Sequence, residues 1–357
     1  MKKFLPIALL AIVAFAGTSK ASILTANNNA TSPGQYTALQ AAITAAHAGD
    51  TILVSGSNTD YAASGTITIN KPVTIWGTGY NLLKDNPITS KVSAIDLQSG
   101  SGGTVIAGLV ISNYIISDNG VQINNITIKR NFLNYITDNL GDGWLIQENV
   151  FGLGTSGSAV NGNNIIVKNN IFQGNPYTAI SNQSANTNLI FSNNLIFGNE
   201  YSSYTFYNAV VSNNIFYDSS KYAFNYITNA SANCIFTNNI VYGNPNTNVF
   251  NIGVNGNTES GNKYNTDPMF TNLKIRQDGY GYITIIDFTG DLTLKAVSPG
   301  HIAGTDGKDI GIYGGSGSQN PLTGNPPIPQ ISTMNILNTV VAPGTTLNVA
   351  LKAKSNN

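Results

Sequence analysis

The chain has 357 residues, of which 10% are charged, with 17 basic and 17 acidic side chains and one cysteine. A formal net charge of zero excludes a nucleic-acid-binding protein that relies on a basic surface, and the single Cys234 excludes a disulfide-stapled scaffold. The 51 asparagines and 36 glycines disfavour long helices and favour turns.

The first 21 residues have the features of a cleaved secretory signal peptide. Lys2 and Lys3 precede an apolar run over residues 4–16, and small residues then lead to Ser19-Lys20-Ala21. The apolar run is shorter than the roughly 20 residues that span a membrane. We therefore expect an exported protein, secreted, at the cell surface or in the periplasm, with no transmembrane segment after signal cleavage.

A short lead over residues 22–35 precedes a predicted helix from Tyr36 to His47, with Leu39 and Ile43 on one face. A strand over residues 51–54 follows directly. The helix is expected to cover the open end of whatever β-structure follows.

Six related segments recur about every 21 residues in the middle of the chain. Each has a short strand of β-branched or aromatic residues, a polar turn that ends in Asn, and a second short strand. The terminal asparagines are Asn131, Asn149, Asn170, Asn194, Asn214 and Asn239. This variable period predicts the coils of a parallel β-solenoid and is too short for the blades of a propeller.

Stacked coils place equivalent residues about 4.8 Å apart, so the repeat defines columns of side chains. Two apolar columns are expected to point inward; they are Ile126, Trp144, Ile165, Leu189, Ala209 and Cys234, and Ile128, Ile146, Val167, Phe191, Val211 and Phe236. The terminal asparagines form a third column, whose amides are expected to hydrogen-bond from coil to coil.

Another column lies between the two inward ones and is expected to face outward, although it is mostly apolar. Its members are Thr127, Leu145, Ile166, Ile190, Val210 and Ile235. An outward apolar stripe needs a cover, which is either a loop or the C-terminal segment of this chain, or else the surface of a partner.

The pattern changes after residue 315. Residues 316–333 are rich in Pro and Gly and predict a linker, and residues 334–357 predict a strand pair or tail. The solenoid itself is expected over residues 36–315.

Several motifs outside the coils carry a resemblance to a known family. They are Ala48-Gly-Asp-Thr-Ile-Leu-Val54, Ile69-Asn-Lys-Pro-Val-Thr-Ile75, Thr266-Asp-Pro-Met-Phe270, Leu294-Lys-Ala-Val-Ser-Pro-Gly300 and Asp309-Ile-Gly-Ile-Tyr-Gly-Gly315. With the Asn-Asn coils, they resemble secreted right-handed parallel β-helix proteins of the pectin-lyase-like superfamily. The resemblance implies an all-β, right-handed parallel β-helix with an N-terminal capping helix and a short C-terminal hairpin-like appendage. It does not imply one activity, because that superfamily contains lyases, hydrolases, epimerases and adhesins.

A polysaccharide lyase needs a base and a cation that neutralises the uronate carboxylate. Lys129, Arg130 and Lys168 are the candidates, since coil spacing puts the two lysines about 9.6 Å apart on the outer face. The alternative is that Arg130 forms an ordinary ion pair with the carboxylate at the same position of the next coil, and that the lysines only solubilise the surface. Asp138, Asp142 and Glu148 could supply oxygen ligands to calcium, which is the candidate cofactor.

Tyrosines gather in and after the loops of the central coils, among Asn and Ser side chains that hydrogen-bond sugars. The candidate carbohydrate-binding residues are Tyr177, Tyr201, Tyr204, Tyr217 and Tyr222. We expect a non-enzymatic protein that binds an extracellular polysaccharide or acts as an adhesive or structural protein at a cell surface. The alternative is a pectate-lyase-like enzyme that cleaves a uronic-acid polysaccharide by β-elimination, or a related epimerase.

Overall fold

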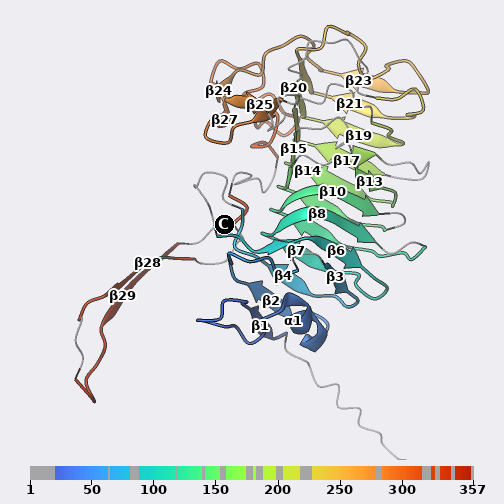
Figure 1. Ribbon diagram of the computed structural model, residues 1–357. Coiled ribbons are helices and arrows are strands. Elements are labelled where there is room, and N and C mark those ends of the chain that lie inside the picture. The colour runs from blue at the N-terminus through green and yellow to red at the C-terminus, as the bar shows by residue number, and fades with distance from the viewer. Residues whose placement is uncertain are drawn as a thin grey trace, which may run out of the picture.

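The computed structural model describes residues 21–62, 65–80, 88–117, 120–138, 141–152, 158–173, 180–181, 188–197, 204–217, 227–277, 284–315, 323–325, 330–338 and 342–354. It is a parallel β-solenoid with one short helix and small C-terminal antiparallel hairpins (Figure 1). The predicted all-β solenoid fold is therefore confirmed.

Sheet A stacks one strand from each coil into an 11-stranded parallel sheet. Its strands, in order, are β1 (Ile23–Ala26), β2 (Thr51–Val54), β4 (Thr74–Trp76), β7 (Val105–Ala107), β9 (Thr127–Lys129), β11 (Leu145–Gln147), β14 (Ile165–Lys168), β17 (Leu189–Ser192), β19 (Ala209–Ser212), β21 (Ile235–Thr237) and β23 (Thr258–Ser260).

Sheet B stacks the second strand of each coil. Its main path, in chain order, is β3 (Thr66–Ile69), β6 (Ala94–Leu97), β8 (Val110–Ser117), β10 (Phe132–Asp138), β12 (Val150–Phe151), β15 (Ile171–Gln173), β18 (Leu195–Phe197), β20 (Ile215–Tyr217) and β22 (Ile240–Tyr242). The short strands β5 (Lys91–Val92), β13 (Ser158–Val160) and β16 (Ile180–Ser181) pair beside this path.

The three antiparallel pairs follow in the C-terminal part. They are β24 (Phe270–Asn272) with β27 (Asp291–Leu294), β25 (Ile275–Gln277) with β26 (Thr284–Ile286), and β28 (Gln330–Ile336) with β29 (Val349–Lys354).

Helix α1 (Leu39–Ala45) lies across the first coil with Leu39, Ala42 and Ile43 buried. The Gln40 side chain holds it there, because Nε2 donates to Thr68 O at 3.0 Å and Oε1 accepts from Thr68 N at 2.8 Å. The predicted helix was too long at both ends, since Ala38 and Ala46 have extended backbone. The expected capping role of the helix is confirmed.

Both predicted inward columns are confirmed, because every member is at most 1% exposed. Between sheets A and B, one residue of each coil takes the left-handed conformation with φ between 52° and 57°; these residues are Arg130, Glu148, Asn169, Asn193, Asn213 and Asn238. Asparagine tolerates this conformation better than most residues. This explains why two asparagines occur together in four of the six coils: the first makes the turn.

The second asparagine of each coil builds the predicted ladder. Each side-chain amide donates to the Oδ1 atom of the next asparagine, at distances of 2.9 to 3.1 Å from Asn131 to Asn239, and Asn262 extends the ladder by one rung at 3.0 Å. The six members from Asn131 to Asn239 are completely buried. The ladder is therefore a structural element inside the turn.

The outward stripe on sheet A is half-buried at Thr127, Leu145 and Ile166 and exposed at its other three members. Ile190, Val210 and Ile235 are 43%, 40% and 48% exposed. Residues 267–314, here called the C-terminal segment, instead cover the outer face of sheet B. On that face, the residue after each ladder asparagine from Asn149 to Asn239 is apolar; these residues are Val150, Ile171, Leu195, Ile215 and Ile240. Of the expected covers for the sheet A stripe, the C-terminal tail is therefore excluded among the described residues, because the C-terminal segment packs on sheet B and the hairpin over residues 330–354 projects away from the solenoid (Figure 1).

The covering residues of the C-terminal segment are Phe270, Ile286, Phe288, Leu292, Ile310 and Ile312. The segment is tied to the left-handed residues of the turn. Asn238 Nδ2 donates to Ala303 O at 3.0 Å, and Asn213 Nδ2 donates to Thr305 Oγ1 at 2.9 Å. Asn169 Nδ2 donates to Gly314 O at 2.8 Å. The segment therefore runs back along the stack, from the later coils toward the earlier ones.

The hairpin β28–β29 projects away from the solenoid (Figure 1). Met334, Ile336, Val349 and Leu351 on it are 41–64% exposed. The expected C-terminal hairpin is confirmed, and in this position it covers no part of the solenoid. Among the described residues no helix combines the length and apolar character needed to span a membrane.

Candidate functional site

The lysine column lies on the outer face of sheet A, as predicted. Lys129, Gln147 and Lys168 are register partners on β9, β11 and β14, and all three are half-buried. Burial lowers the pKa of Lys129, the charge of Arg130 lowers it further, and Glu148 opposes the shift. The three side chains therefore form one column on the outer face of sheet A, in which the pKa of Lys129 is lower than usual.

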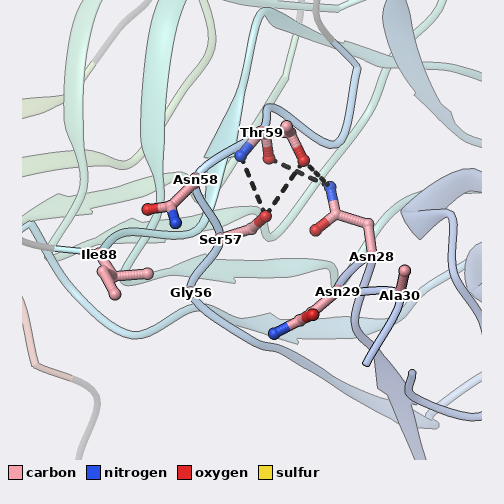
Figure 2. A pocket seen from close by; sticks show the side chains of 8 residues that line it. All are labelled: Asn28, Asn29, Ala30, Gly56, Ser57, Asn58, Thr59 and Ile88. Carbon is pink, nitrogen blue, oxygen red and sulfur yellow. Dashed lines mark hydrogen bonds between the residues drawn. The ribbon is translucent and has the colours of Figure 1, made fainter. Parts of the chain in front are cut away.

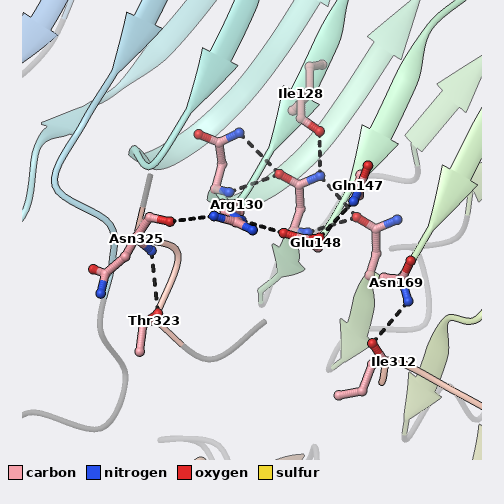
Figure 3. A network of polar contacts seen from close by, with 11 residues as sticks. Ile128, Arg130, Gln147, Glu148, Asn169, Ile312, Thr323 and Asn325 are labelled. Carbon is pink, nitrogen blue, oxygen red and sulfur yellow. Dashed lines mark hydrogen bonds and ion pairs between the residues drawn. The ribbon is translucent and has the colours of Figure 1, made fainter. Parts of the chain in front are cut away.

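Arg130 and Glu148 are buried in the turn between sheets A and B. They occupy the left-handed turn position on neighbouring coils, and their side chains are 9% and 1% exposed. Arg130 Nε and Glu148 Oε2 form a buried ion pair, as Figure 3 shows. Gln147 Nε2 donates to the second carboxylate oxygen, Glu148 Oε1, at 2.7 Å. The predicted ion pair between Arg130 and Glu148 is therefore present, although it is buried and not a surface pair.

Arg130 also contacts the chain beyond the C-terminal segment, since its Nη1 donates to Asn325 O at 3.0 Å (Figure 3). Tyr80 lies beside this network and is 2% exposed. Tyr80 N donates to Thr323 O at 3.0 Å. The cluster therefore anchors the returning chain.

The candidate calcium ligands do not form one site. Asp142 Oδ1 accepts hydrogen bonds from Asn163 N at 2.8 Å and Nδ2 at 3.2 Å, and Asp142 Oδ2 accepts from Gln122. Asp142 and Glu148 lie on opposite ends of β11, roughly 15 to 20 Å apart at about 3.3 Å per residue. Asp138 ends β10, and its side chain lies outside the described part of the chain. Within the described ranges, no three His, Cys, Asp or Glu residues gather as metal ligands would.

The five candidate tyrosines separate into three groups. Tyr177, Tyr201 and Tyr222 lie outside the described residues. Tyr204 is completely buried, with its ring 5.6 Å from that of Phe206, so its assignment to a sugar-binding surface was wrong. Tyr217, at the end of β20, is half-buried and lines a pocket of about 300 Å³.

Residues of the C-terminal segment form most of this pocket. The other lining residues are Asp267, Met269, Phe270, Thr271, Asn272, Leu273 and Lys295. We call this the Tyr217 pocket. Sequence analysis missed all seven, because the segment carrying them is packed against Tyr217 only by the tertiary fold.

Aromatic packing fixes the Tyr217 ring in the wall of the pocket. Its centroid is 5.2 Å from that of Phe197 and 5.0 Å from that of Tyr242 on the flanking coils, and 6.0 Å from that of Phe270. Burial raises the pKa of Tyr217 to about 12, with Tyr242 and Asp267 adding to the shift. The hydroxyl therefore stays protonated at neutral pH and can donate a hydrogen bond.

The chemistry of the Tyr217 pocket is mixed. Tyr217 and Phe270 provide aromatic surface, Asn272 an exposed amide, and Asp267 and Lys295 one charge of each sign. An aromatic wall with a few polar groups suits a ligand that has both C–H faces and hydroxyl groups.

No protein-family model matches this chain, and no curated protein does so. One solved structure with a similar fold is that of the PL6-family alginate lyase AlyGC, at 13% sequence identity and a TM-score of 0.36. The match covers 82% of this chain and 59% of the lyase, so this chain spans less than two thirds of that protein. At this identity the likeness is one of fold alone.

Proposed function

We propose that this protein is a non-catalytic polysaccharide-binding β-solenoid that acts outside the cytoplasm and holds a sugar chain at the Tyr217 pocket. The observation that supports binding is the pocket itself, in which a fixed aromatic ring lies beside exposed hydrogen-bonding groups. The N-terminal signal-peptide pattern supports export.

The size and rigidity of the pocket favour a saccharide. Its volume of about 300 Å³ is at the lower end of the range for small-ligand sites, which fits one or two sugar units of a longer chain. The Tyr217 ring is held between neighbouring rings, so binding does not have to order it. Asp267 and Lys295 lie at the same pocket, which favours a sugar with hydroxyl or amide groups over a densely anionic chain.

Binding is tested by calorimetry with a panel of neutral and acidic polysaccharides. Tyr217→Ala and Asn272→Ala should each weaken binding of the recognised polymer at least about tenfold, or 1.4 kcal/mol. Tyr114→Ala is the matched control, because Tyr114 is also half-buried and packs on another tyrosine, Tyr135, at 5.5 Å. Equal binding by Tyr217→Ala and wild type would contradict the proposal.

A second candidate function is a lyase that uses Lys129 as its base. The lowered pKa of Lys129 favours it, because a less strongly protonated amine is a better base at neutral pH. In that reaction Lys129 Nζ takes the proton next to the uronate carboxylate. The C–H electrons form the new C=C bond, and the glycosidic C–O bond breaks with its oxygen taking up a proton.

The lyase is tested by the ultraviolet absorbance of unsaturated uronides on anionic polysaccharides, with and without calcium. Activity that is lost in Lys129→Ala and kept in Tyr217→Ala would establish the lyase and replace the binding proposal. No absorbance change on any polymer, together with Tyr217-dependent binding, would support the non-catalytic function.

A further inference from the structure

A second pocket lies at the other end of the solenoid, where the chain leaves β1 and β2. It also has a volume of about 300 Å³ and is lined by Asn28, Asn29, Ala30, Gly56, Ser57, Asn58, Thr59 and Ile88 (Figure 2). We call it the Asn28 pocket. Tyr217 lies seven steps of sheet A further along, about 34 Å away on the solenoid axis.

Hydrogen bonds hold the walls of the Asn28 pocket in place. Asn28 Nδ2 donates to both O and Oγ1 of Thr59 at 3.1 Å, and Thr59 N donates to Ser57 Oγ at 3.1 Å (Figure 2). Ser57 N donates to Thr89 O at 3.0 Å, which joins the loop to the segment that carries Ile88. These contacts form the site before any ligand arrives.

Gly56 lies where the loop after β2 comes close to the segment that carries Ile88. A Cβ atom at this position would lie 2.5 Å from Ile88 O, so only glycine allows the contact. The Ile88 side chain remains 60% exposed and gives the pocket an apolar wall.

One polar atom of the pocket has no hydrogen-bond partner among the residues that the structure describes. Asn28 Oδ1 is buried, and no group in the described part of the chain donates a hydrogen bond to it. A buried acceptor without a hydrogen bond is unfavourable, so a donor supplied by a ligand is favoured there. The Asn58 side chain is exposed at the rim and offers a further amide acceptor and donor.

Among the described residues, no charged side chain lines the Asn28 pocket, in contrast to the Tyr217 pocket. Amides and hydroxyls that face one apolar wall match a ligand with several hydroxyl groups, apolar C–H faces and no charge. An anion would be desolvated at such a site without a cation to pair with it.

We propose that the Asn28 pocket binds a neutral saccharide unit, with a sugar hydroxyl donating to Asn28 Oδ1 and the C–H face of the ring against Ile88. The site does not depend on the Tyr217 pocket, so either can fail without the other. If both bind, one sugar polymer that reaches both sites gains avidity.

The test uses the full chain with maltotriose, cellotriose and mannotriose as neutral probes and trigalacturonate as the charged probe. Binding is measured by calorimetry and by saturation-transfer NMR. At least one neutral trisaccharide should bind, and trigalacturonate should bind at least about tenfold more weakly.

Two variants locate the site. Ala30→Phe fills the pocket from an exposed position and should reduce affinity at least about tenfold, and Asn58→Ala should reduce it about threefold. Asn335→Ala, an exposed asparagine on the distant C-terminal hairpin, is the matched control and should bind as wild type does. Tyr217→Ala should still bind trisaccharide at the Asn28 pocket, and adding Ala30→Phe to that variant should remove the remaining binding.

Three results would overturn the inference. The first is that no neutral probe binds the wild type, which would mean that the pocket holds only water. The second is that Ala30→Phe and Asn58→Ala both bind as wild type does, and the third is that Tyr217→Ala abolishes trisaccharide binding. Only the last of these would support the Tyr217 pocket, so the two proposals are judged separately.

Discussion

Arg130 and Glu148 occupy the left-handed turn position that Asn169, Asn193, Asn213 and Asn238 fill in the later coils, and they pair with each other inside the turn. Neither residue favours that backbone conformation, for which asparagine is better suited. The pair therefore replaces two asparagines at the point where the returning chain, at Asn325, meets the stack.

Glu148→Ala should destabilise the protein by about 3 to 5 kcal/mol, because it leaves the Arg130 guanidinium buried without a countercharge. The double variant Arg130→Asn/Glu148→Asn should lose far less, since it restores the residue used in the other coils. Urea unfolding of wild type, single and double variants measures the difference. A double variant less stable than Glu148→Ala would show that the ion pair itself stabilises the turn.

Asn170→Ala should cost about 3 kcal/mol or more. Asn170 Oδ1 accepts a hydrogen bond from the amide of Asn149, and Asn170 Nδ2 donates to Asn194 Oδ1 and Ile146 O. The substitution therefore leaves several buried polar groups without these hydrogen bonds. Asn188→Ala is the control, because the Asn188 side chain is exposed and, among the described residues, its one hydrogen bond is a long 3.4 Å contact to Asn164. Similar unfolding midpoints for the two variants would contradict a structural role for the ladder.

Val210 and Val211 are neighbours with opposite environments. Val210 faces outward and is 40% exposed, whereas Val211 is completely buried. Val211→Ala should cost about 2 kcal/mol through lost burial and a small cavity, and Val210→Ala should cost about 0.5 kcal/mol or less. Equal losses, measured by chemical denaturation, would indicate that the sheet A stripe is covered in solution.

Asp50 should make stability depend on acid pH. Its carboxylate accepts hydrogen bonds from Ser22 N and His47 N, both at 2.7 Å, and these bonds lower its pKa below the ordinary value of 3.8. A carboxyl group whose pKa is lower in the folded state than in the unfolded state stabilises the folded protein. Its full contribution is present at pH values above the unfolded-state pKa and is lost as the pH falls through the folded-state pKa. Wild type should therefore lose more stability between pH 5 and 3 than Asp50→Asn, by thermal unfolding at each pH. Parallel pH curves for the two proteins would exclude this contribution.

The repeat by itself determined the solenoid, its inward columns and the asparagine ladder. In a parallel stack each residue lies on its equivalent in the next coil, so alternation along one strand is enough to say which side chains are buried. The same logic placed Lys129, Gln147 and Lys168 in one column and paired Arg130 with Glu148.

Only the tertiary structure decided where the C-terminal segment lies. Its hydrogen bonds to the turn residues join positions 65 to 145 residues apart, such as Asn169 and Gly314, and no local periodicity encodes them. That placement covers the outer face of sheet B, leaves Ile190, Val210 and Ile235 exposed on sheet A, and completes the pocket around Tyr217. Alternation along a strand predicts that a side chain faces outward. Which residues pack against that side chain depends on a segment far away in the sequence, which packs where it can bury the most apolar surface.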